Sequence, residues 1–336
     1  GRASEWSAAA LRWCETLRDG LMYPGLCRVY AAELAYLRGD WDEATAGAHR
    51  AGEELTAYDP RYAGAAFVLI GDFHRVRGEL DDASAAYARA HRLGATPQPG
   101  LALIEFARGR ADAAMDALRS IWREAPAAPL PHAQLLSALV DVADSVDDDD
   151  ALDAATAELG EIRDATDSPL LAALAAIAVG VRAHRQGDPA HAVTVLRAAA
   201  ITLDQLEFPY ESARCRLRLA DALDTTGDTV GAKLELHRAT ADFERLGAVP
   251  GLHAARTQRR IGSPADGDCP LSSRELDVLR LVAAGRTDGD VADELVISHH
   301  TVARHVSNIR TKLGVSSRAA ATALASERGW LVAPDR

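Results

Sequence analysis

The chain has 336 residues, enough for two or more domains or one extended array, and a formal net charge of −12. Apolar residues make up 48% and aromatic residues only 5%, which favours close-packed helices and argues against a β-sandwich. The most apolar run, PLLAALAAIAVGV at 169–181, is shorter than the about 20 residues that a membrane-spanning helix needs. It is expected to form one buried helix of a bundle.

Cysteine usage favours a cytoplasmic protein. Cys14, Cys27, Cys215 and Cys269 show neither a metal-knuckle nor a redox spacing, so we expect reduced thiols. The chain begins at Gly1 in helix-like sequence and without an initiator methionine. This start suggests a processed chain or the C-terminal part of a longer protein.

A six-residue pattern recurs through the first 261 residues: glycine, a polar residue, three variable residues and alanine. It reads GDWDEA, GELDDA, GRADAA, GDPAHA and GDTVGA, with its glycines at Gly39, Gly78, Gly109, Gly187 and Gly227. The steps between these glycines are 39, 31, 78 and 40 residues, and the longest is twice 39. We therefore expect a sixth unit near residue 148, where DDDDALDAA (147–155) lacks the glycine and Ala154 lies within one residue of the alanine position.

Each unit has the features of a helical hairpin. Glycine closes a helix in the left-handed conformation, and the acid that usually follows suits the start of the next helix. The alanine allows close approach of the two helices. Prolines placed to stop or start helices separate the units: Pro60, Pro97, Pro99, Pro126, Pro129, Pro169 and Pro209.

These units resemble the tetratricopeptide repeat (TPR), and more closely the long helical repeats that precede the DNA-binding domain in large LuxR-type bacterial regulators. We predict an all-α solenoid over residues 1–261, in preference to an irregular helical domain. Such an array offers a curved surface to a protein, a peptide or a small-molecule effector. The acidic stretch DSVDDDD (144–150) lacks the ligand order of an EF-hand, so a solvated turn is expected there.

The segment GSPADGDCP (262–270) has the composition of a linker. Residues 271–333 then predict four helices. Ser272 and Glu275 form a capping box, with Leu271 and Leu276 as its hydrophobic staple. Thr287 and Ser298 can cap the next two helices, and a last helix is expected from Ser316 or Ser317 to Gly329. The third helix carries a stripe at helical spacing: Val302, Val306, Ile309 and Leu313.

The third helix is basic although the chain is acidic. Residues 1–265 hold 28 Lys and Arg against 39 Asp and Glu, whereas residues 299–336 hold six against two. Two helices, a short turn and a basic amphipathic helix predict a helix-turn-helix that enters the major groove of DNA. The motifs LSSREL, AAG, ISHHTV, HVSNI and KLGV within 271–321 closely resemble the LuxR-type helix-turn-helix of bacterial transcription regulators.

The resemblance assigns roles to individual residues of the third helix. It implies base reading by Ala303, Arg304 and Ser307, and phosphate contact or helix bracing by Thr301 and Lys312. His305 and Asn308 lie beside them. The predicted DNA-binding set is His299, His300, Thr301, Ala303, Arg304, Ser307, Asn308, Arg310 and Lys312.

The chain departs from the LuxR pattern at three positions. Position 303 is often lysine in the family and is alanine here, so Arg304 is expected to carry more of the base readout, for instance to a guanine. Asp288 replaces the usual asparagine at the start of the second helix, where Gly289 also lies in the first turn. Both Asp288 and Gly289 are expected to weaken backbone contacts at that helix start, because an added anion faces phosphate.

Several classes of site have no motif. Neither lysine, Lys233 or Lys312, follows a glycine, so no P-loop is present, and an ATPase module would have to precede Gly1. His300 and His305 are five residues apart with no nearby carboxylate or thiol, which disfavours a metal site. We expect no enzyme activity, no cofactor and no membrane partner.

The leading hypothesis is a cytoplasmic bacterial transcription regulator that binds promoter DNA and senses an effector on its repeat array. The resemblance implies a homodimer through the last helix, about 317–328, and RNA polymerase as a further partner. A rival is an interaction scaffold with a C-terminal domain that does not bind DNA. A third hypothesis is a regulator that hydrolyses nucleotides.

Overall fold

The computed structural model describes residues 22–124, 128–259, 271–295, 297, 299–328 and 330–331. Their regular secondary structure is helical throughout, which confirms the predicted all-α class. The helices of the N-terminal array are α2 (Met22–Arg38), α3 (Trp41–Thr56), α4 (Pro60–Arg77), α5 (Leu80–Arg92), α6 (Gly100–Ala107), α7 (Ala111–Trp122), α8 (Pro129–Ser145), α9 (Asp149–Asp164), α10 (Pro169–Arg185), α11 (Pro189–Gln205), α12 (Pro209–Thr225), α13 (Thr229–Leu246) and α14 (Val249–Arg259).

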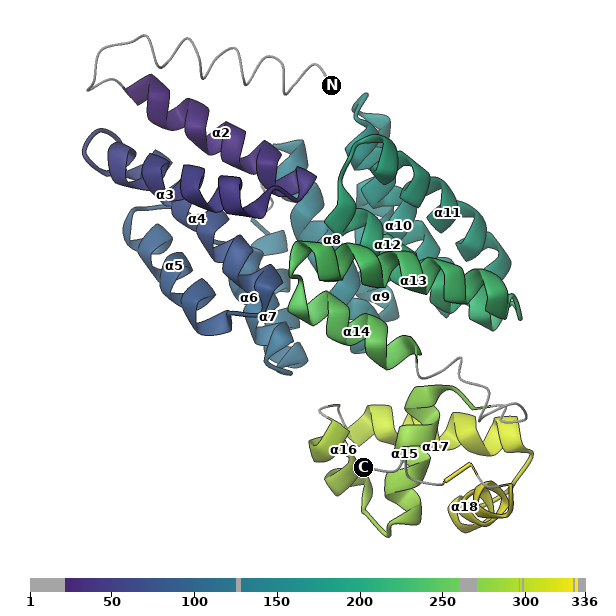
Figure 1. Ribbon diagram of the computed structural model, residues 1–336. Coiled ribbons are helices and arrows are strands. Elements are labelled where there is room, and N and C mark those ends of the chain that lie inside the picture. Colours follow the sequence, from purple (N-terminus) through teal and green to yellow (C-terminus); the bar gives the residue numbers. More distant parts are fainter. Residues whose placement is uncertain are drawn as a thin grey trace.

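Consecutive helices pack as hairpins, from α2–α3 to α12–α13, and the hairpins stack side by side (Figure 1). The glycine of each predicted unit lies between the two helices of a hairpin, with a left-handed φ of 79–86°. Only glycine takes this conformation without steric cost. Four of the predicted prolines are the first residues of helices: Pro60, Pro129, Pro169 and Pro209.

The predicted sixth unit is the hairpin α8–α9, and its glycine position is taken by Asp147. This residue has a positive φ of 60°, in the left-handed region that the glycines of the other hairpins also occupy. The side chain five residues later is Leu152, which is buried, whereas Ala154 is exposed. The expected alanine position was therefore wrong, because the turn begins at Asp147 and no alanine follows at the required distance.

The array closes on itself instead of remaining an open arc. Helix α12 contacts α2, and α14 contacts α4, so the first and last hairpins share one apolar cluster. Aromatic rings hold this closure. The ring of Trp41 packs edge-on against Tyr210, and Tyr210 packs edge-on against Phe243, with ring centroids 5.7 Å and 6.0 Å apart. The first and last hairpins of the described array are therefore in direct contact.

The apolar run at 169–181 lies within α10, which packs between α9 and α11. Among the described helices, none is long and apolar enough to cross a bilayer. Cys215 is a free, buried thiol, while Cys14 and Cys269 lie outside the described residues. Burial raises the pKa of the Cys215 thiol to about 12, so this sulfur stays protonated and unreactive.

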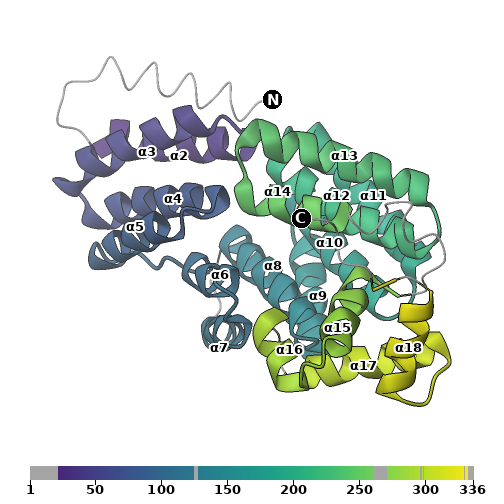
Figure 2. The same ribbon diagram turned by 60° about the horizontal axis from the view of Figure 1, so that its bottom comes forward.

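Four further helices follow: α15 (Ser273–Ala283), α16 (Asp288–Leu295), α17 (His299–Leu313) and α18 (Arg318–Glu327). They enclose an apolar cluster of their own, to which Val278, Leu279, Val302 and Ile309 contribute. Figure 2 shows this unit beside α9. The linker predicted at 262–270 lies outside the described residues.

Candidate nucleic-acid interface

The start of α15 has the predicted capping box. Ser272 Oγ accepts a hydrogen bond from the Glu275 amide at 3.3 Å, and Glu275 Oε2 accepts one from the Ser272 amide at 2.7 Å. Leu271 and Leu276 are both buried in the same cluster, as the hydrophobic staple requires. These contacts fix the position at which the chain enters the domain.

Helix α16 begins with a second reciprocal cap. Thr287 Oγ1 accepts from the Asp290 amide at 3.2 Å, and the Asp290 carboxylate accepts from the Thr287 amide at 2.9 Å. Hydrogen bonds from Thr287 lower the pKa of the Asp290 carboxyl. The cap predicted at Ser298, before α17, lies outside the described residues.

Helix α17 is amphipathic as predicted. Val302 and Ile309 are buried, and Val306 and Leu313 pack partly buried against the same cluster. The opposite side is exposed and basic or polar. Its exposed members from the predicted site are His299, Ala303, Arg304, Ser307, Asn308, Arg310 and Lys312.

One predicted site residue, Thr301, does not lie on the open face in this way. Thr301 is 8% exposed, so of the two roles that the resemblance implied, its burial favours bracing the helix. The side chain of His300 lies outside the described part of the structure. His305, beside the site, is half-buried, and burial is the main cause that lowers its pKa, which favours a neutral imidazole.

Lys312 is tied to the start of α15. Its Nζ donates to Glu275 Oε2 at 2.8 Å, and the Glu275 side chain is 5% exposed. One carboxylate therefore caps α15 and anchors the C-terminal end of α17. This geometry favours the bracing role of Lys312, although its side chain remains half-exposed.

Asp288 does not present a bare anion at the start of α16. Arg318 of α18 donates to its carboxylate, and the same guanidinium donates to the carbonyl oxygen of Arg286. The expected repulsion of phosphate by Asp288 is reduced by this pairing. Sequence reasoning missed the pair because the two residues are 30 positions apart.

One base-reading candidate touches the repeat array. Arg304 Nη1 lies 3.2 Å from Asp147 Oδ1, in the turn between α8 and α9. The acidic stretch at 144–150 is therefore not simply the solvated turn that its composition predicted. Arg185 of α10 also donates to Asp147 Oδ1, at 2.7 Å.

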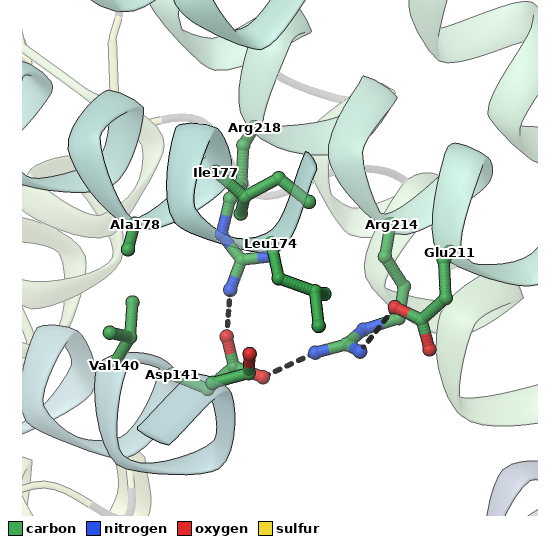
Figure 3. Close-up of a pocket in the computed structure, with 9 residues that line it drawn as sticks. Val140, Asp141, Leu174, Ile177, Ala178, Glu211, Arg214 and Arg218 are labelled. Carbon is green, nitrogen blue, oxygen red and sulfur yellow. Dashed lines mark hydrogen bonds and ion pairs between the residues drawn. The ribbon is translucent and has the colours of Figure 1, made fainter. Parts of the chain in front are cut away.

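A second candidate site is a pocket lined by residues of α8, α10 and α12 (Figure 3). Arg214 and Arg218 of α12 both donate to the carboxylate of Asp141 on α8, and Arg214 also pairs with Glu211 at 2.9 Å. Figure 3 shows these polar groups converging beside apolar side chains. The pocket is partly open to solvent and has apolar lining from Val140, Leu174, Ile177 and Ala178.

The sequence contained only a weak signal for this pocket. Arg214 and Arg218 are four residues apart and so share a helix face, but such pairs are common on exposed helices. Their partner Asp141 is 73 residues from Arg214. The nearby carboxylates raise the pKa of Arg214 despite its burial, so the guanidinium stays charged.

Comparison with known proteins defines the class of the C-terminal unit. Residues 269–325 match the family described as bacterial regulatory proteins, luxR family. The chain is 42% identical over 62 residues to the uncharacterised transcriptional regulatory protein YvfU of Bacillus subtilis, which is 18% of this chain and 31% of YvfU. It is 43% identical over 61 residues to DesR of the same organism, again 18% of this chain and 31% of the relative.

A longer match enters the array. A putative HTH-type transcriptional regulator of Mycobacterium tuberculosis is 30% identical over 160 residues, which is 46% of this chain and 17% of that protein. The chain thus spans less than a third of the length of these three relatives.

A solved structure supports the architecture. A Rap protein, crystallised in complex with Competence and Sporulation Factor, superimposes with a TM-score of 0.51 over 97% of this chain and 90% of the other, at 14% identity. At this identity the likeness concerns the fold alone. The chain carries a luxR-family helix-turn-helix domain behind a TPR-like helical array, and the relatives that share the domain are transcription regulators.

Proposed function

We propose that this chain is the sensing and DNA-binding part of a bacterial transcription regulator that acts in the cytoplasm. Residues 1–261 form the sensing domain, 262–270 the linker and 271–333 the DNA-binding domain. The observation that carries the proposal is the exposed face of α17, which is free of acids and lies within the luxR-family match. We further propose RNA polymerase as a partner at the promoter.

Groove geometry gives α17 its role. The major groove of B-DNA is about 12 Å wide and admits one helix with its side chains. With the stripe of Val302 and Ile309 on the domain core, the exposed Ala303, Arg304 and Ser307 turn toward base edges. Arg310, one turn further along, is placed for phosphate.

Binding to DNA as a dimer would use α18. Ala319, Ala323 and Ser326 are exposed and follow one another at helical spacing, while Ala321 and Ala325 are buried in the domain. Small exposed side chains let two such helices approach closely. This face is our proposed dimer seam, and two half-sites in the target DNA are expected with it.

Titration of the full-length chain with duplexes tests the DNA proposal. A duplex selected from a random-sequence pool should bind far more tightly than an unrelated one. A plot of log Kd against the logarithm of the salt concentration should be linear, with a slope of about 0.9 for each phosphate neutralised. Arg310→Ala should weaken every duplex alike and lower that slope by about one per subunit. Equal weak binding of all duplexes would favour the scaffold hypothesis instead.

The proposed effector site is the pocket of Asp141, Arg214 and Arg218. Two guanidiniums converge on one carboxylate there, beside apolar walls, which suits a ligand with an apolar body and a carboxylate group. Such a ligand would take the place of Asp141 between the two arginines. A short peptide with a free C-terminus is the ligand class that we favour.

Peptide amidation tests this effector class. Short peptides bearing a free C-terminal carboxylate should bind the full-length chain about tenfold more tightly than the same peptides as amides, because a hydrogen-bonded ion pair is lost. Arg218→Ala should remove that preference, and Arg197→Ala, on the exposed side of α11, should keep it. Calorimetric titration measures both. An equal affinity of acids and amides for the wild-type chain would exclude carboxylate recognition.

A further inference from the structure

The contact between the array and α17 involves a carboxylate that the array itself holds in place. Asp147 occupies the left-handed position of the α8–α9 turn, with a φ of 60°. Arg185 donates to Asp147 at 2.7 Å, to Asp149 at 2.9 Å and to the carbonyl oxygen of Asp144 at 3.0 Å. The Asp147 carboxylate is therefore pre-organised before Arg304 reaches it.

The same carboxylate faces the middle of α17. Its Oδ1 lies 3.2 Å from Arg304 Nη1, and its charge also acts on the imidazole of His305, one residue further along the helix. In Figure 2 the C-terminal unit lies beside α9. The turn thus stands on the side of α17 that carries Arg304.

We propose that the α8–α9 turn is a docking site for the DNA-reading face of α17, and that the docked arrangement excludes DNA. The inference rests on the proposed function, and it assigns a regulatory contact to the same site. A helix in the major groove has base edges in front of it and a sugar-phosphate backbone on either side. The α8–α9 turn, with Asp147 only 3.2 Å from Arg304, therefore occupies space that the DNA needs. Asp147 and a base edge compete for one guanidinium.

The contact that holds the docked arrangement is weak enough to be broken. The described helices of the array and of the C-terminal unit share no extensive packing with one another. Arg304 keeps 45% of its side chain exposed and Asp147 keeps 23%, so water weakens their ion pair. A pair of this kind biases an equilibrium by about two- to fivefold. DNA or a ligand on the array can therefore overcome it.

The turn offers a matched pair of substitutions. Asp147→Asn removes the charge that faces Arg304, and asparagine tolerates the left-handed conformation. Asp149, the first residue of α9, pairs with the same Arg185. Asp149→Asn therefore removes an equal charge next to the turn and leaves the contact with Arg304 in place. Asp147→Gly is a second version of the first change, since glycine holds the equivalent position in the other predicted units.

Affinity for DNA is the first readout. The probe is a labelled duplex selected by the wild-type full-length chain from a random-sequence pool, at fixed salt. Asp147→Asn and Asp147→Gly should each lower Kd by about two- to fivefold, because the fraction of chains with a free α17 rises. Asp149→Asn is the control for the loss of one negative charge. It should change Kd only by the general electrostatic effect of that charge.

Small-angle X-ray scattering without DNA is the second readout. The Asp147 variants should have a larger radius of gyration than Asp149→Asn, because the C-terminal unit is released. Equal Kd values for the Asp147 and Asp149 variants, or tighter binding with unchanged scattering, would overturn the inference and leave the proposed function standing. If neither the wild-type chain nor any variant prefers one duplex over others, the proposed function is wrong, and this inference is wrong with it.

Discussion

Arg304→Ala is expected to weaken binding to the selected duplex by about 1–3 kcal/mol and to relax the preference for one base pair in each half-site. A guanidinium makes two parallel hydrogen bonds to a guanine, and position 303 offers only a methyl group beside it. Fluorescence anisotropy with the selected duplex and with single-base variants measures both effects. Arg310→Ala is the comparison, because it should reduce affinity without changing the preference.

The size of the Arg304 effect should depend on Asp147. In the wild-type chain part of the interaction with DNA replaces the existing contact with Asp147, which is 3.2 Å away. Arg304→Ala should therefore cost more in an Asp147→Asn background than in the wild-type chain. Unchanged base preference after Arg304→Ala, in either background, would remove Arg304 from the readout.

Local sequence signals predicted most of the array correctly. The glycine of each hexapeptide unit closes a hairpin, and prolines start α4, α8, α10 and α12. Both features act within a few residues of the chain, so a single sequence contains them. Asp147 shows the limit of such signals, because an aspartate in a left-handed turn is rare and its acidic neighbours suggested simple hydration.

Contacts between distant segments could not be predicted in this way. Tyr210 joins Trp41 and Phe243 to close the array, and Asp141 meets Arg214 across 73 positions. Each partner alone is an ordinary aromatic or charged residue on a helix face. Their meeting depends on the summed rotation of several hairpins, which a repeat spacing near 39 residues does not specify.

The DNA-binding unit shows the same division. The capping box of α15 and the apolar stripe of α17 were legible because their members are neighbours in sequence. The second partner of Glu275, Lys312, is 37 residues away. The family resemblance had implied phosphate contact or helix bracing for Lys312, but it could not identify Glu275 as its partner. The structure gives the capping carboxylate a further role, as the point at which α17 is held to α15.

Glu275→Ala is accordingly expected to destabilise the C-terminal unit by about 2–3 kcal/mol. The change removes the acceptor for the Ser272 amide, at 2.7 Å, and for Lys312 Nζ, at 2.8 Å. Most of the loss comes from the capping interaction and the buried site, since Lys312 is 45% exposed and regains water. Hydrogen exchange of the α15 amides in the full-length chain measures the local free energy of opening.

Asp277→Ala is the matched control for this prediction. Asp277 lies on the same helix and pairs with Arg280 at 3.2 Å, but its side chain is 41% exposed. An exposed pair of this kind contributes about 0.5 kcal/mol or less, so α15 should exchange almost as slowly as in the wild-type chain. Equal exchange rates in the two variants would mean that Glu275 is not the anchor of α17. A selective effect of Glu275→Ala, together with weaker DNA binding, would place the α15 cap among the residues that position the reading helix.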